Sequence, residues 1–84
     1  MLYTIFLKKS AEKELEYLPE KIYDKIIDRL NSLSDDPRPI GVKKLKNLEG
    51  YRLRIGDYRI LYLVDDLLKN IDIYSIAHRK DVYK

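Results

Sequence analysis

The sequence predicts a small α+β domain in which two N-terminal helices pack on one face of a mainly antiparallel four-stranded sheet. Apolar residues alternate with Arg52 and Arg54 over residues 51–55, and after a Gly-Asp pair the run Tyr58, Ile60, Tyr62 and Val64 alternates with Arg59, Leu61 and Leu63. This period of two on both sides of the pair is typical of a β-hairpin. Residues 10–33 instead repeat their apolar side chains at helical spacing. Because each helix has one apolar stripe to bury, a sheet is the expected partner. We expect the order β-α-α-β-β-β, with residues 1–84 forming a single domain.

The N-terminal half supplies the first strand and both helices. Residues 2–7 are apolar and β-branched enough for a strand, which Lys8 and Lys9 would end. Ser10 is expected to cap the first helix. Pro19 suits the first position of the second helix, where its missing N–H is not needed. The two buried stripes would consist of Ala11, Leu15 and Leu18, and of Ile22, Ile26, Leu30 and Leu33.

The hairpin register follows from a two-residue loop at positions 56 and 57, which places residue 54 opposite 59 and residue 52 opposite 61. Arg52, Arg54 and Arg59 then share one face, and the other face is apolar and aromatic. Like charges opposite one another destabilise a sheet slightly, so this grouping favours an anion site. Planar guanidinium groups suit phosphate. The alternative is a solvated outer face without a ligand.

A last strand is expected over residues 71–77, because Ile71, Ile73, Ser75 and Ala77 alternate with Asp72, Tyr74 and Ile76. Antiparallel pairing with residues 58–64 would bring the end of this strand beside the start of its partner. Residues that are distant in the sequence would then converge in one cationic patch. The expected members of that patch are Arg54, Arg59, His78, Arg79 and Tyr83.

Composition excludes several kinds of site. The chain has 84 residues, no cysteine and one histidine, His78. It therefore offers no thiolate or polyhistidine metal site, and we expect no metal and no cofactor. No run approaches the roughly 20 apolar residues of a membrane span, and the lysines follow the apolar N-terminal run instead of preceding it as in a signal peptide. We expect a cytoplasmic protein without a membrane partner.

The basic residues are concentrated in the second half of the chain. The net charge is +3; residues 1–40 carry 7 Lys/Arg and 8 Asp/Glu, and residues 41–84 carry 10 and 6. This asymmetry favours a polyanionic partner. Lys43, Lys44 and Lys46 lie just before the hairpin, where they are either solvated surface residues or contacts to a phosphate backbone.

Two motifs together resemble a known family. The run K-L-x-x-L-x-G-Y-R-L-R-I-G-D-Y-R-I-L-Y, followed by I-A-H-R-K-D-V-Y, is similar to the RelE/ParE superfamily of toxins from type II toxin-antitoxin systems. The similarity is to its RelE branch of ribosome-dependent mRNA interferases. It covers the whole chain in element order and is most specific from residue 45 to 83. The resemblance implies a RelE-like fold and a metal-independent endoribonuclease that inhibits translation.

The family's reaction assigns roles to particular positions. Relatives cut mRNA in the ribosomal A site by attack of the ribose 2′-hydroxyl on the adjacent phosphate, which gives a 2′,3′-cyclic phosphate. By position, Arg52 and Arg54 match two basic residues of the first hairpin strand, and Arg59 matches the arginine of the Y-R motif. Arg79 matches the arginine after the last strand, and Tyr83 the C-terminal tyrosine. We expect Arg59 and Arg79 to bind phosphate oxygens and Tyr83 to stack on or position a base. Lys43, Lys44 and Lys46 would contact RNA.

The sequence departs from the family pattern at the proton acceptor. Typical members have lysines where this chain has Arg52 and Arg54, and arginine is a poor general base. Histidine is the residue type best suited to proton transfer at neutral pH, and His78 is the one histidine of the chain. One hypothesis therefore gives His78 an acid or base role; the alternative is that it packs or contacts RNA.

The resemblance leaves competing functions open. A ParE-like toxin would bind and inhibit DNA gyrase without nuclease activity, and the same fold supports both. A toxin that has lost its activity and only binds its antitoxin is a third alternative. The expected partners of an active toxin are a cognate antitoxin, in a hetero-oligomer, and the mRNA in the ribosomal A site. Leu61 and Leu63 share the face of Arg59 and would suit an antitoxin segment, unless the C-terminal tail or a loop covers them.

Overall fold

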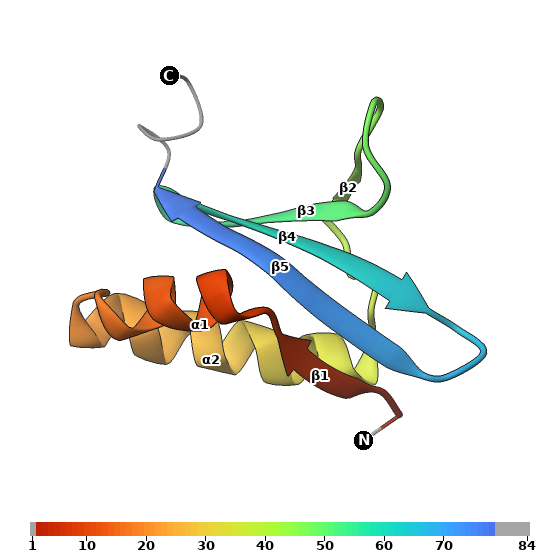
Figure 1. The fold of residues 1–84 in the computed structure, drawn as a ribbon, viewed down its shortest axis with the longest axis horizontal. Coiled ribbons are helices and arrows are strands. Elements are labelled where there is room, and N and C mark those ends of the chain that lie inside the picture. The colour runs from red at the N-terminus through yellow and green to blue at the C-terminus, as the bar shows by residue number, and fades with distance from the viewer. Residues whose placement is uncertain (1, 79–84) are drawn as a thin grey trace.

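The fold is a five-stranded mixed sheet with two helices packed on one face. A computed structural model describes residues 2–78. In chain order the elements are β1 (Thr4–Leu7), α1 (Lys9–Glu16), α2 (Glu20–Asp35), β2 (Lys43–Lys44), β3 (Tyr51–Ile55), β4 (Tyr58–Asp65) and β5 (Asn70–His78). The strands are arranged in the order β1-β5-β4-β3-β2, with β1 parallel to β5 and every other neighbouring pair antiparallel. Figure 1 shows α1 and α2 on the same side of the sheet. We call the opposite side the open face.

The predicted fold class is confirmed, with one strand more than expected. The additional strand, β2, is two residues long and pairs Lys43 with Arg52 and Lys44 with Tyr51. Two adjacent lysines show neither alternation nor β-branched side chains, so no strand was expected at these positions. Its pairing extends the sheet beyond β3 and brings the lysine-rich segment beside the hairpin.

The helices begin close to the expected positions. Helix α1 starts at Lys9 with Lys8 as its N-cap and without a side-chain cap, so the prediction that Ser10 caps it was wrong. Pro19 was predicted to be the first residue of the second helix; it is instead the N-cap of α2, which begins at Glu20. The connection is tight because the backbone N–H of Leu18 donates to the carbonyl of Leu15 (3.2 Å). The two apolar stripes therefore face the sheet together.

The core lies between the helices and the inner face of the sheet. Its buried apolar residues are Ala11, Leu15, Ile26, Leu30, Leu33, Leu53, Ile55, Ile60, Tyr62, Ile71, Ile73 and Ile76. Ser34 is also buried, and its hydroxyl donates to the carbonyl of Tyr3 at 2.8 Å. The N–H of Tyr3 donates back to the carbonyl of Ser34 at 3.0 Å. This reciprocal pair fixes the end of α2 beside β1.

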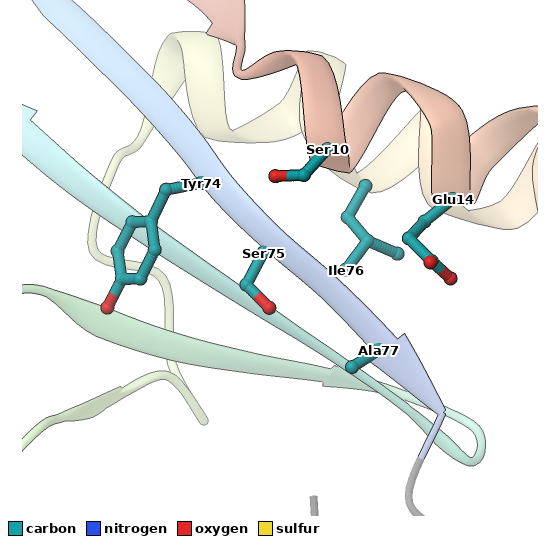
Figure 2. Close-up of a pocket in the computed structure, with 6 residues that line it drawn as sticks. All are labelled: Ser10, Glu14, Tyr74, Ser75, Ile76 and Ala77. Atoms are coloured by element: carbon teal, nitrogen blue, oxygen red, sulfur yellow. The ribbon is translucent and has the colours of Figure 1, made fainter. Parts of the chain in front are cut away.

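A β-bulge in β5 changes the face on which its last residues lie. Leu61 pairs with Ser75 but Tyr62 pairs with Ile73, so Tyr74 is the extra residue. Figure 2 shows Ile76 directed toward α1, and Tyr74, Ser75 and Ala77 directed away from it. The predicted alternation is therefore wrong after residue 73. Ile76 joins the core, and Ser75 and Ala77 lie on the open face.

A polar cluster holds the loop after α2 against the end of the β4–β5 hairpin. The guanidinium of Arg38 donates to both carboxylate oxygens of Asp66, at 2.8 and 3.2 Å. The hydroxyl of Tyr3 donates to the same carboxylate at 2.7 Å. Nε of Arg38 donates to the hydroxyl of Tyr51 at 2.8 Å. The bidentate pair of Arg38 and Asp66, with a tyrosine hydroxyl bonded to each member, fixes the loop geometrically, although its charges are partly solvated.

The substitution Asp66→Asn is expected to remove a contribution to stability that the wild type has at neutral pH and loses in acid. The Arg38 guanidinium, and after it the Tyr3 hydroxyl, lower the pKa of Asp66 to about 2, whereas an unfolded aspartate titrates at about 3.9. Because the folded pKa is the lower one, the contribution is complete above about pH 4 and is lost as the pH falls through about 2. Urea unfolding at pH 7 and at several pH values from 4 to 2 measures it.

The difference in unfolding free energy between wild type and Asp66→Asn should shrink as the pH falls. Asp24→Asn, on the exposed side of α2, is the matched control and should show a small difference that does not change with pH. A pH-independent difference for Asp66→Asn would contradict this account of the cluster.

Candidate nucleic-acid interface

Three arginines lie on the open face of the hairpin. Arg54 pairs with Arg59 and Arg52 pairs with Leu61, as the two-residue loop predicts. Residues opposite each other across two strands project to the same side, and the alternate positions Leu53, Ile55 and Ile60 are in the core, so these arginines point away from the helices. The prediction that Arg52, Arg54 and Arg59 share a face is confirmed.

Beside this cluster is a pocket of about 200 Å³ that the sequence did not reveal. Its described lining residues are Leu45, Leu48, Arg52, Arg59, Leu61, Ser75 and Ala77. The arginines come from β3 and β4, the small residues from β5, and two of the leucines from the loop between β2 and β3. The pocket thus combines two guanidinium groups with apolar walls.

The loop that forms one wall depends on a close backbone approach at Gly50. The carbonyl of Gly50 accepts a hydrogen bond from the N–H of Leu45 at 3.0 Å, which closes the loop. Gly50 has φ +111°, and a Cβ built on it would lie 2.4 Å from the carbonyl oxygen of Tyr62. Only a residue without a side chain fits there. A glycine just before a predicted strand was the available signal for this feature.

The apolar surface continues along the open face beyond the pocket. Leu48, which is 64% exposed, lies with Leu63 and Tyr74 around a neighbouring hollow. The hydroxyl of Tyr74 donates to the carbonyl of Glu49 at 3.3 Å, which braces the same loop, and burial raises the pKa of this tyrosine. At the far end the lining residues become acidic, with Glu49, Asp65, Asp66 and Asp72. The open face therefore runs from cationic through apolar to acidic.

Strand pairing brings His78 beside the end of β4 that carries Arg59, but its side chain lies on the other face of the sheet. It pairs with Tyr58, as expected for the antiparallel arrangement, and Ala77 pairs with Arg59. The His78 and Tyr58 rings meet edge to face, with centroids 5.0 Å apart and an interplanar angle of 87°. Tyr58 packs against the core, so the prediction that His78 joins the arginine patch was wrong. The bulge at Tyr74 is the reason, because it shifts the alternation by one residue.

The other predicted site residues do not all lie on the open face. Lys43 pairs with Arg52 and shares the open face, whereas Lys44 pairs with Tyr51 on the helix-facing side. Lys46 is exposed in the following loop. Arg79 and Tyr83, also predicted as site residues, lie outside the described residues.

The arrangement suits a phosphodiester. Guanidinium groups bind phosphate oxygens in a bidentate manner and stabilise the charge that develops during phosphoryl transfer. Within residues 2–78 no three His, Cys, Asp or Glu side chains come together to hold a metal ion. In the same range, no helix combines the length and the apolar character needed to cross a membrane. The arginines of the open face can position a phosphate and stabilise its charge.

Comparison with known proteins identifies the family to which this α+β domain belongs. Residues 5–83 match a family model described as "ParE toxin of type II toxin-antitoxin system, parDE". The chain is 31% identical to Toxin RelG of Mycobacterium tuberculosis over 100% of this chain and 99% of that protein. It is 32% identical to Toxin RelE of the same organism, covering 98% and 87%.

Solved structures agree with the sequence relatives. The RelE–RelB complex of Pyrococcus horikoshii OT3 contains a chain that is 32% identical, with a TM-score of 0.86 over 94% of this chain and 97% of that chain. The RelBE2 complex of Mycobacterium tuberculosis gives 30% identity and a TM-score of 0.82, over 94% and 100%. The protein belongs to this family of type II toxin-antitoxin toxins, in its RelE-like branch.

Proposed function

We propose that the protein is a ribosome-dependent endoribonuclease that cleaves mRNA in the A site and so inhibits translation in the cytoplasm. The observation that carries the proposal is the pairing of Arg54 with Arg59 on the uncovered face, with Arg52 beside them. Three guanidinium groups held on one face repel one another, and a bound RNA phosphate, which is negatively charged, would offset this repulsion.

The reaction needs no protein nucleophile because RNA carries its own. The ribose 2′-oxygen attacks the adjacent phosphorus, the bond to the 5′-oxygen breaks, and the products are a 2′,3′-cyclic phosphate and a 5′-hydroxyl. Arg59 and Arg54 bind the non-bridging oxygens and stabilise the additional negative charge of the transition state. Arg79 and Tyr83 take the phosphate-binding and base-positioning roles that their motif positions imply, and Lys43 contacts the RNA backbone. The metal-independent reaction fits a site built from arginines.

Proton transfer has no assigned residue on the open face. Arg52 and Arg54 stand where typical relatives have lysines, and an arginine holds its proton too tightly to act as a base. His78 packs edge to face on Tyr58 and is on the opposite side of the sheet. We therefore favour the alternative role for His78, which is packing at the end of β5. Unchanged single-turnover cleavage and an unchanged pH profile for His78→Ala are the expected results.

The partner that fits the apolar part of the open face is an antitoxin segment. Leu61 and Leu63 project to the open face beside Arg59, and the solved relatives include RelE–RelB complexes. A segment with apolar and acidic residues would cover both the leucines and the guanidinium groups. We propose that a RelB-like antitoxin binds here in a hetero-oligomer.

Antitoxin binding is expected to weaken as salt increases. The screening length falls from about 10 Å at 0.1 M to about 3 Å at 1 M ionic strength, which removes much of the attraction between exposed charges. Calorimetric titration of the cognate antitoxin across this range measures the effect. A Kd that does not change with salt would contradict the electrostatic part of the interface, and a Kd unaffected by Leu63→Ala would contradict the apolar part.

Inhibition of DNA gyrase is the second candidate function, and the description of the matched family as a ParE toxin favours it. A gyrase inhibitor has no chemical need for a converging set of arginines. The experiment that separates the two combines 5′-end mapping of mRNA on translating ribosomes with a gyrase supercoiling assay. Cuts inside A-site codons with normal supercoiling support the nuclease; intact mRNA with blocked supercoiling supports the gyrase inhibitor.

A further inference from the structure

We infer that the pocket beside Arg52 and Arg59 is a subsite for one nucleobase, in which Ser75 contacts the edge of the base. The inference rests on the proposed nuclease function, because an RNA strand places a base one sugar away from each phosphate. It adds a ligand group and a specificity-determining residue to the site.

The size of the pocket fits one ring system. Its volume is about 200 Å³, which corresponds to roughly six or seven water molecules at about 30 Å³ each. Pockets for larger ligands measure about 300–1,000 Å³. A planar base fills this space, and its attached ribose and phosphate would remain outside, where the guanidinium groups lie.

The walls have the chemistry that binds the two faces of a base. Leu45, Leu48 and Leu61 supply apolar surface, and the guanidinium planes of Arg52 and Arg59 can stack on an aromatic ring. Both kinds of contact are tolerant of base identity, because every base has a π face. They provide affinity without choosing a base.

Ser75 is the residue that would discriminate between bases. Among the described residues that line the pocket, it carries the one uncharged polar side chain, and a hydroxyl both donates and accepts hydrogen bonds. It reaches the open face because of the bulge, which puts Tyr74 and Ser75 on the same side of β5 (Figure 2). Bulges commonly re-aim a side chain beside a functional site. Here the bulge serves both positions: Tyr74 braces the loop through Glu49, and Ser75 enters the pocket.

Titration with mononucleotides tests the subsite without requiring catalysis. The probes are the four nucleoside 5′-monophosphates, with ribose 5-phosphate as the control that lacks a base. Ring currents from a bound base should shift the methyl resonances of Leu45, Leu48 and Leu61, and ribose 5-phosphate should leave them unchanged. Equal shifts from ribose 5-phosphate would overturn the inference, since the pocket would then respond to phosphate alone.

A variant of the wall sharpens this titration. Leu48→Ala should weaken nucleotide binding for all four bases and leave ribose 5-phosphate binding as it is. Leu67→Ala is the matched control, because Leu67 is an exposed leucine in the turn between β4 and β5, away from the pocket. Equal nucleotide affinity in Leu48→Ala and Leu67→Ala would overturn the role of the wall.

Cleavage preference tests the role of Ser75. We compare the single-turnover rates on A-site codons that differ in one base. In Ser75→Ala the ratio between the fastest and the slowest codon should fall by about two- to tenfold, the range expected for one lost hydrogen bond. Ser75→Thr retains the hydroxyl and should retain the preference, and Ser32→Ala on α2 is the matched control. Unchanged preferences in Ser75→Ala would overturn the assignment. If the wild type cleaves nothing, the proposed function fails, and the mononucleotide titration still decides whether the pocket binds a base.

Discussion

The substitution Arg59→Ala is expected to lower the single-turnover rate of mRNA cleavage by about 10²–10³-fold, the usual loss when one preorganised charge-stabilising donor is removed. Arg59 pairs with Arg54 and also lines the pocket, so it is the described arginine with the largest number of proposed contacts to the RNA. The measurement is the rate on ribosomes carrying a defined A-site codon at saturating toxin, which reports the chemical step.

Two companion variants separate charge from geometry. Arg59→Lys keeps the charge but loses the planar fork, so it should recover part of the rate and not all of it. Arg29→Ala, on the exposed side of α2, is the matched control and should cleave at the wild-type rate. Far-UV circular dichroism should show all three variants folded. A wild-type rate for folded Arg59→Ala would exclude this arginine from the site.

The substitution Gly50→Ala is expected to have the largest effect on stability. The new Cβ would meet the carbonyl oxygen of Tyr62 at 2.4 Å, and φ +111° is a conformation that residues with a side chain rarely adopt. Backbone strain of about 1–3 kcal/mol and overpacking of about 1–3 kcal/mol together predict a loss of about 2–6 kcal/mol in the free energy of unfolding. Relief would require the loop to move off β4, so the pocket wall formed by Leu45 and Leu48 should be displaced as well.

Gly41→Ala is the control that isolates the close approach. Gly41 has φ +94° but a Cβ there would have nothing within 4 Å, so only backbone strain applies. Chemical denaturation should therefore find Gly50→Ala less stable than Gly41→Ala by about 1–3 kcal/mol. Equal stabilities for the two variants would show that the approach of Gly50 to Tyr62 does not limit the loop.

The sequence predicted the features that depend on local patterns. Helical spacing identified α1 and α2, and a two-residue loop with alternation fixed the register of β3 and β4, including the pairing of Arg54 with Arg59. Each of these follows from side-chain periodicity over a few turns or a few residue pairs. The resemblance of the motifs to the RelE branch agrees with the relatives named RelG and RelE, and the match to the ParE toxin model agrees with the superfamily.

The features that the sequence did not predict depend on tertiary contacts. The bulge at Tyr74 has no signature such as a glycine, yet it decides the face of Ser75, Ile76 and His78. With strict alternation Ile76 would project to the open face. The bulge instead buries its side chain in the core, which offsets the cost of the irregular strand pairing. Likewise, the pocket wall arises because the loop between β2 and β3 folds onto the open face, which only the contact of Gly50 with β4 reveals.

Whether Arg54 and Arg59 act on one phosphate is tested most directly by a double-mutant cycle on the single-turnover cleavage rate. If both guanidinium groups hold the same phosphodiester, Arg54→Ala should cost much less rate in the Arg59→Ala background than in the wild type, because groups that act as a unit are non-additive. Strictly additive losses, or no loss in either single variant, would contradict the claim that the paired arginines of the open face form the phosphate site.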